Sequence, residues 1–196
     1  LSEAGRQATE RYLFRKWFPA REPAGLTLGR VSLDGAGAGF INAYPGPVRV
    51  AELVINAADV FVEGAAGGTS VDLLTVSSAG VLDAARLAAL AVGDLDMREQ
   101  ATLAVAFDAA GAAPVLNVSG DLTLPAEARY TVSLTAGVAP PSSALLIAVD
   151  GTVLTPAGAT AWAHAGQVSR AARVIVDAAA RTVWLNTPRG TLLSVR

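Results

Sequence analysis

The sequence predicts an all-β protein, specifically a right-handed parallel β-solenoid (β-helix) with capped ends. Two observations lead to this prediction. The phrase GDLDMREQATLAV at residues 93–105 returns as GDLTLPAEARYTV at residues 120–132, with most of its apolar positions kept and most of its polar letters changed. The chain also has 19 glycines and 10 prolines among its 196 residues, which is typical of a protein rich in turns.

Both phrases contain two apolar residues spaced two apart, a three-residue gap, a small residue and a further apolar residue. The same template fits earlier parts of the chain, although Asp59 breaks its small position in one repeat. Its leading residues, at nearly regular steps along the chain, are Val31, Leu53, Leu74, Leu95 and Leu122, of which only the last follows after a clearly longer step. The small position holds Gly80, Ala101 and Ala128 in three of the repeats. Further along, Val174, Val176 and Ala180 predict one more repeat.

Alternation with a period of two indicates strands that bury one face. A strand pair that recurs every 20–30 residues is typical of stacked coils, because each coil buries its apolar face only against its neighbours. The fixed apolar positions are therefore expected to lie in columns, while the variable polar positions face water. A β-sandwich or jelly roll, which also contains short alternating strands, is the alternative fold.

The repeat phrases GDLDMREQATLAVAF, LNVSGDLTLPAEARYTVSL and ARVIVDAAARTVWL resemble repeat units of bacterial autotransporter-type passenger domains and related exported β-repeat proteins. The resemblance covers roughly residues 48–137 and, less closely, residues 169–186. It implies an extended β-helical stalk that is secreted or held at the bacterial cell surface and has an adhesive or structural role.

We expect one continuous domain in three parts. Residues 1–25 would form an N-terminal amphipathic cap, residues 26–137 the solenoid repeats, and residues 138–196 looser coils that end in a hairpin cap. In the N-terminal part, a basic aromatic segment offers an interaction surface, and its candidate residues are Tyr12, Arg15, Lys16 and Trp17. Because the chain begins at Leu1, we also expect a processed form or a piece of a longer protein.

The C-terminal part carries three further expectations. Residues 172–188 should form a strand, a short turn and a second strand, with Trp184 as a plug over the C-terminal edge of the solenoid. ALLIAVD, at residues 144–150, should be a buried strand. Trp162 and His164 stand two residues apart, so they should share one face of a strand.

Charge and composition limit the classes of function. The net charge is −2, but the middle of the chain is acidic and both ends are basic. This layout argues against a nucleic-acid surface along the molecule and suits ends that meet the acidic flank of another copy. Without any cysteine, disulfides and thiolate metal sites are excluded. No apolar run reaches about 18 residues, so no transmembrane segment is expected.

Asp94, Asp96 and Glu99 place three carboxylates within six residues, which makes them the candidate ligands for calcium. The spacing is not that of an EF-hand, and a solvated outer face is the simpler interpretation. Asp94 and Asp121 hold equivalent repeat positions and should stack on successive coils. His164 is the only histidine, and no nucleophile motif accompanies it, so no catalytic residue and no cofactor are expected.

The sequence therefore predicts a non-enzymatic structural or adhesive β-repeat module, exported or at the cell surface, with other copies of itself or neighbouring domains as partners. End-to-end association would follow from the basic ends and the acidic middle. The alternative function is that of a carbohydrate-binding module or a β-helical carbohydrate-active enzyme that uses the acidic outer face, with a glycan as partner.

Overall fold

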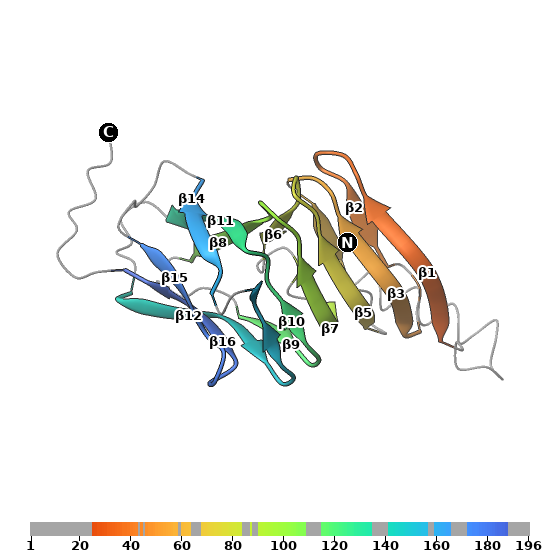
Figure 1. Cartoon of the computed structure of the whole chain (residues 1–196). Helices are drawn as coiled ribbons and strands as arrows, with labels where there is room; N and C mark the ends of the chain where they lie inside the picture. Colours follow the sequence, from red (N-terminus) through yellow and green to blue (C-terminus); the bar gives the residue numbers. More distant parts are fainter. Residues whose placement is uncertain are drawn as a thin grey trace, which may run out of the picture.

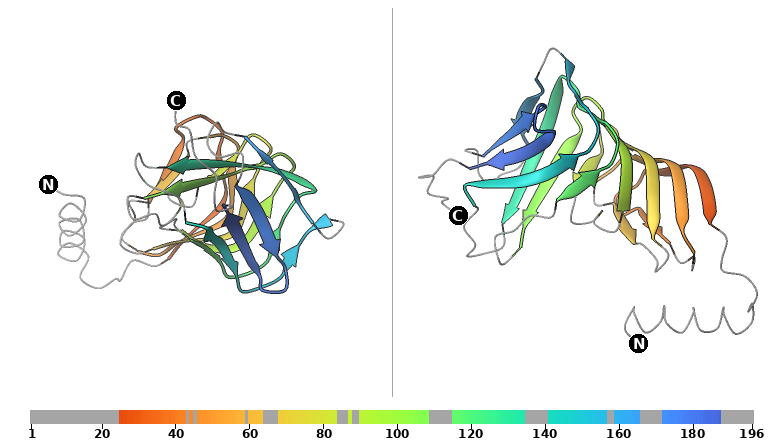
Figure 2. Two further views of the ribbon diagram at one scale, coloured as in Figure 1. Left: turned by 90° about the vertical axis from the view of Figure 1, so that its left-hand side faces the viewer. Right: turned by 90° about the horizontal axis from the view of Figure 1, so that it is seen from below.

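The computed structural model of the chain describes residues 25–42, 44, 46–58, 60–63, 68–83, 87, 90–108, 115–134, 141–156, 159–165 and 172–187. These residues form an all-β structure of strands and turns, as predicted. Figures 1 and 2 show the strands as a row that runs from β1 (Leu26–Leu33) at one end to β15 (Arg173–Asp177) at the other. Within the described residues, no helix has the length and apolar character needed to cross a membrane.

The largest sheet begins with four eight-residue strands that pair in parallel. They are β1, β3 (Val48–Ile55), β5 (Thr69–Val76) and β7 (Leu90–Met97). The sheet continues through β9 (Leu116–Val118) and β12 (Ser143–Val149), which are also parallel to their predecessors. Two short strands also belong to this sheet. β10 (Leu122–Thr123) pairs in parallel with β7, and β13 (Val153–Leu154) pairs in parallel with β10. Parallel pairing of successive repeats distinguishes this arrangement from the antiparallel sheets of a sandwich or jelly roll.

Two smaller parallel sheets are built from the last strand of each repeat. One contains β6 (Val81–Asp83), β8 (Thr102–Phe107), β11 (Glu127–Leu134) and β14 (Ala161–His164). The other pairs β2 (Gly39–Ile41) with β4 (Phe61–Glu63). Each of the first four repeats thus contributes one strand to the large sheet and one to a smaller sheet, and each of the next two contributes two strands to the large sheet and one to a smaller sheet.

The apolar residues of the repeat lie in a column, as predicted. The register joins Val31, Leu53, Leu74, Leu95 and Leu122 as successive Cα partners, and Val153 follows them. Leu53, Leu74, Leu95 and Leu122 are fully buried. The nearly equal steps between the first members return the chain to the same register, so each leucine is covered by the leucine of the next repeat.

Both sets of sheets face one core. Leu82 and Leu103 in the smaller sheet belong to the same buried cluster as Leu74 and Leu95 in the large sheet. Removing apolar surface from water contributes about 25 cal/mol per Å², so this shared cluster is the main source of stability. The fold is therefore held by contacts between successive repeats of the chain.

The small position of the template has a steric cause. Gly80 follows the turn between β5 and β6, and a Cβ built on it would collide with the backbone carbonyl of Ile55 in the preceding repeat. The same turn is tied to that repeat by the Ser77 N–H, which donates to the Ile55 oxygen at 2.9 Å. A small residue therefore lets one turn lie directly on the next.

One predicted repeat is wrong. Val174 belongs to β15, which pairs antiparallel with β16 (Thr182–Asn186), and β16 pairs antiparallel with β12. Residues 173–186 therefore form a hairpin, as predicted, but not a further parallel repeat. The residue that follows Leu122 in the column is Val153, after a longer step than any earlier one.

The prediction that Trp184 plugs the C-terminal edge is also wrong. Alternation along β16 turns Val183 and Leu185 into the core, where both are fully buried, and turns Trp184 outward, where 37% of its surface is exposed. The indole N–H donates to Oγ1 of Thr182 at 2.9 Å on the outer face. The expected N-terminal cap at residues 1–25 falls almost entirely outside the described residues, which begin at Gly25.

Candidate functional site

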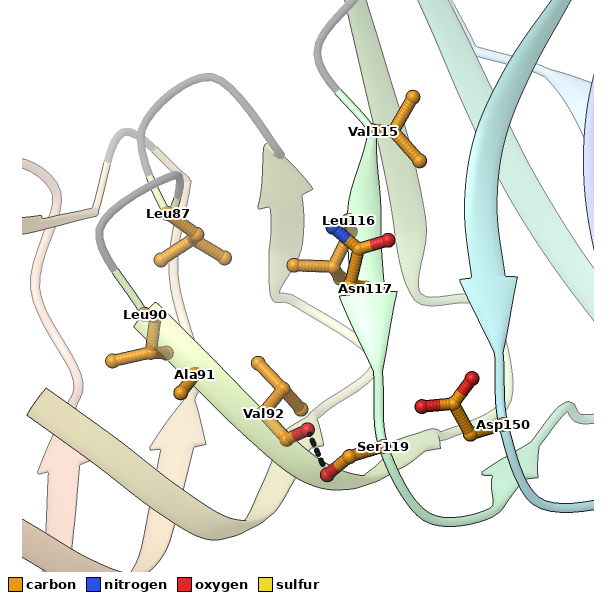
Figure 3. Close-up of a pocket in the computed structure, with 9 residues that line it drawn as sticks. All are labelled: Leu87, Leu90, Ala91, Val92, Val115, Leu116, Asn117, Ser119 and Asp150. Carbon is orange, nitrogen blue, oxygen red and sulfur yellow. Dashed lines mark hydrogen bonds between the residues drawn. The ribbon is translucent and has the colours of Figure 1, made fainter.

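A groove opens in the large sheet where β7 and β9 diverge (Figure 3). Only Val92 and Val118 are register partners between these two strands, whereas β5 and β7 pair along their whole length. The contact is fixed at Ser119, whose backbone N–H and hydroxyl both donate to the Val92 carbonyl, at 3.0 and 2.9 Å. On the N-terminal side of this contact, no register pair joins the described residues of β7 and β9.

The chain before β7 explains why the ladder stops. The Leu90 N–H donates to the Leu87 carbonyl at 2.9 Å, and the Leu87 N–H donates to the Asp83 carbonyl at 3.1 Å. The first of these two bonds occupies the Leu90 N–H, so this group does not donate to β9. The step from Leu95 to Leu122 is also longer than the step from Leu74 to Leu95, and β9 pairs with β7 only at Val118 before β10 pairs with β7 again at Leu122.

The groove has a volume of about 430 Å³ and combines an apolar floor with polar groups. Its apolar lining consists of Leu87, Leu90, Ala91, Val92, Val115 and Leu116. Asn117, Ser119 and Asp150 supply an amide, a hydroxyl and a carboxylate, and all three residues are exposed. Figure 3 shows them on the β9 and β12 side of the opening, with Leu90 and Ala91 on β7 opposite.

Asp150 is positioned through its backbone. Its N–H donates to the Val118 carbonyl at 2.9 Å, and its own carbonyl accepts a hydrogen bond from Nη1 of Arg181 at 2.8 Å. Of the described lining residues, it is the only one with an ionisable side chain. General acid–base hydrolysis of sugars uses a pair of carboxyl groups. The described lining contains one carboxylate, and what it offers a ligand is hydrogen bonding and apolar contact.

The three candidate calcium ligands do not converge in the structure. Oδ1 of Asp94 accepts the Asp121 N–H at 2.8 Å, and Oδ2 of Asp96 lies 2.8 Å from Nη2 of Arg98. Glu99 accepts the N–H groups of Ala126 and Glu127 at 3.0 and 3.1 Å. Each carboxylate thus has its own partner, and the described residues contain no group of three or more histidine or acidic side chains arranged to hold a metal ion.

The expected stacking of Asp94 on Asp121 is confirmed, and it has a structural use. Asp94 receives the Asp121 N–H, and Oδ1 of Asp121 in turn receives the Thr152 N–H at 2.7 Å in the next repeat. The acidic outer face is therefore partly a ladder of carboxylates that satisfy backbone donors. Asp72 lies apart from this ladder and forms an ion pair with Arg49, its Oδ1 lying 2.8 Å from Nε.

His164 and Trp162 share one face of β14, as predicted, and both are half-buried. The His164 ring meets the Tyr130 ring edge to face, with centroids 5.2 Å apart. Burial raises the pKa of Tyr130, whose hydroxyl donates to the buried Ala172 carbonyl. This cluster packs β14 against β11 and binds Ala172, the residue before β15. The predicted interaction residues Tyr12, Arg15, Lys16 and Trp17 lie outside the described residues.

Sequence reasoning missed the groove residues Asn117, Ser119 and Asp150. The available signal was the break in repeat length after Leu95, because a longer step marks the place where two strands need not stay paired. Comparisons with known protein families, with curated proteins and with solved structures find no match to this chain.

Proposed function

We propose that the chain is a closed β-solenoid that serves as a non-enzymatic structural or adhesive module, exported or held at the cell surface. The observation that carries this proposal is the column from Val31 to Val153, in which parallel repeats bury one another's leucines. Such a stack presents a regular outer face to water and to partners, while the buried apolar contacts between neighbouring repeats stabilise it. The surface location rests on the resemblance of the repeat phrases to exported β-repeat proteins.

In this proposal, the groove between β7 and β9 is the adhesive site. It interrupts an otherwise regular face and combines exposed hydrogen-bonding groups with apolar lining. These are features of sites that bind a ligand by shape and a few polar contacts. Ala91 lies exposed on the β7 side of the groove, so a bulky residue there would fill it.

The test is a binding assay on beads coated with the protein, using immobilised extracellular-matrix proteins as targets. Wild type should bind at least one target, and Ala91→Trp should reduce that binding at least tenfold. Thr27→Trp is the matched control, because Thr27 is exposed in the same row of outward residues but lies on β1, three strands from the groove. If Thr27→Trp and Ala91→Trp bind equally well, the groove is not the adhesive site.

Carbohydrate binding is the second candidate, and the polar side chains of the groove favour it. Asn117, Ser119 and Asp150 offer the amide, hydroxyl and carboxylate groups that bind sugar hydroxyls. A glycan array measures this directly, and Asp150→Ala should abolish any signal that depends on the groove. A melting curve with and without calcium tests the metal prediction at Asp94, Asp96 and Glu99. A calcium-dependent rise in melting temperature would favour this second function.

Association between copies is part of the first proposal, and head-to-tail stacking of basic ends on acidic flanks is its expected form. Such contacts weaken as salt screens them. Light scattering at low and high salt measures the effect. Particle mass should fall as the salt concentration rises, and a monomer at high protein concentration under both conditions would contradict head-to-tail stacking.

A further inference from the structure

The outer face of the C-terminal hairpin and its neighbour β12 is ordered into three rows across the strands. The first row contains Ser143, Asn186 and Arg173, and the second contains Leu145, Trp184 and Ile175. The third contains Ala148, Thr182 and Asp177. The outer face therefore has a basic end, an apolar middle and an acidic end along the edge strand β15.

Two of the three residues in the apolar middle row are exposed, and Leu145 is half-buried. Ile175 has 45% of its surface exposed and Trp184 has 37%, although both are large hydrophobic residues. They do not serve the core, because the alternate residues Val174, Val183 and Leu185 are the buried ones. Exposed apolar residues that lie side by side on a sheet mark an interaction surface more often than isolated ones do.

β15 is the last strand of the large sheet. It pairs with β16 on one side, and no described strand pairs with it on the other. An unpaired strand edge is a template for pairing with another strand, because its free N–H and C=O groups require partners. Figure 2 shows β15 at the opposite end of the strand row from β1.

The sequence of β15 complements itself. It reads RVIVD, with exposed Arg173 and Asp177 at its ends and exposed Ile175 at its centre. In an antiparallel pair of two identical strands centred on Ile175, Arg173 of each copy lies opposite Asp177 of the other. Ile175 then lies opposite itself, and Val174 lies opposite Val176 on the core side.

We propose that two copies of this chain form a two-fold dimer by antiparallel pairing of their β15 strands about Ile175. The pairing joins the two large sheets into one and makes the apolar row continuous, from Leu145, Trp184 and Ile175 of one copy to the same residues of the other. An isologous contact of this kind closes at two copies. The proposal is thus separate from head-to-tail stacking, which adds copies without limit.

The register follows from the charges. Shifting one strand by a single residue would turn the apolar face of one copy toward the opposite side from that of its partner. Shifting by two residues would place Ile175 opposite a charged residue and leave one charge at each end without a counter-charge. Opposite charges across a strand pair stabilise it, whereas like charges in that position destabilise it. Only the pairing centred on Ile175 matches both charges and both faces.

The experiment uses two single charge reversals, Arg173→Asp and Asp177→Arg, in the full chain. Each alone places like charges opposite each other at both ends of the strand pair, so its dimer dissociation constant should rise at least tenfold. An equimolar mixture of the two variants should form heterodimers, because every pair across the interface then has opposite charges. The double variant Arg173→Asp/Asp177→Arg should dimerise as wild type does. Sedimentation velocity over a concentration series measures all four samples.

Two controls make the result specific. Thr27→Asp adds a charge to the exposed face of β1 at the other end of the sheet and should leave dimerisation unchanged. Asp177 also accepts the Ala180 N–H at 2.8 Å, so circular dichroism melting checks that Asp177→Arg remains folded. The double variant carries the same loss and still dimerises if the proposal holds. A wild-type monomer at the highest protein concentration of the series, or no recovery in the mixture, would overturn the proposal without affecting the adhesive function.

Discussion

The carboxylate of Asp94 accepts a hydrogen bond from the backbone N–H of Asp121, in the next repeat, at 2.8 Å. The two aspartates hold the same place in successive repeats, next to the register partners Leu95 and Leu122. Gly120 precedes Asp121, and its own N–H donates to the Gly93 carbonyl at 2.9 Å. The recurring letters GDL thus describe a corner at which one repeat binds the backbone of the next.

Gly120→Ala tests this corner. A Cβ at position 120 would collide with Oδ1 of Asp94, so the carboxylate must move and give up its hydrogen bond from the Asp121 N–H, and the free energy of unfolding should fall by about 0.5–1.5 kcal/mol. Denaturant unfolding measures the change. Gly29→Ala is the matched control, because a Cβ there meets nothing within 4 Å, and its effect should stay within about 0.5 kcal/mol.

A double variant identifies the cause of that loss. Asp94→Ala removes the colliding oxygen, so Gly120→Ala should cost less in the Asp94→Ala background than in wild type. A double-mutant cycle measured by denaturant unfolding gives the coupling energy. Equal costs in the two backgrounds would show that the carboxylate of Asp94 is not what excludes a side chain at position 120.

Leu95→Ala tests the column of leucines. Leu95 is fully buried between Leu74 and Leu122, so the substitution leaves a cavity and should cost about 2–5 kcal/mol in thermal or denaturant unfolding. Leu154→Ala is the comparison, because 48% of Leu154 is exposed. It should cost less than about 1 kcal/mol. Similar costs for the two would contradict the burial of the column.

Tyr130→Phe tests the contact between β11 and Ala172, the residue before β15. The variant leaves the buried Ala172 carbonyl without its donor and should cost about 1–3 kcal/mol. The pKa of Tyr130 is raised by burial, so the folded state keeps the phenol proton at a pH where the unfolded state loses it. Wild-type stability is therefore fully present below about pH 10 and falls as the pH rises further. Melting curves between pH 8 and pH 11 should show a smaller fall for Tyr130→Phe.

The column of leucines was predictable because two physical constraints coincide in it. A constant step returns the chain to the same register, and each leading residue is apolar, so Leu53, Leu74 and Leu95 identify one another in the sequence. Val153 was missed because the step that separates it from Leu122 is longer than any earlier step in the column. Val174 was assigned wrongly because its period-two pattern is common to every half-buried strand and carries no information about strand direction.

The groove and the carboxylate ladder were harder to predict for a different reason. Asp94 is visible as an acidic residue in the sequence, but the donor it binds belongs to the next repeat and is a backbone group. Asn117 and Asp150 come together only because β9 leaves the register of β7 while remaining paired with β12. Trp184 faces outward because the alternation of β16 places Val183 and Leu185 in the core. From the sequence alone, either Trp184 or the pair Val183 and Leu185 could face the core.

Disulfide trapping tests the parallel, in-register stack most directly, because the chain has no cysteine and every thiol would be an introduced one. Ser70 and Ala91 are register partners on the neighbouring parallel strands β5 and β7, where Cα atoms lie roughly 4.8 Å apart, within the range that a disulfide spans. Thr27 and Ala91 share the same row but lie three strands apart. The stack predicts that the Ser70→Cys/Ala91→Cys variant oxidises to an intramolecular disulfide and that Thr27→Cys/Ala91→Cys does not. A disulfide in the second variant, or none in the first, would contradict it.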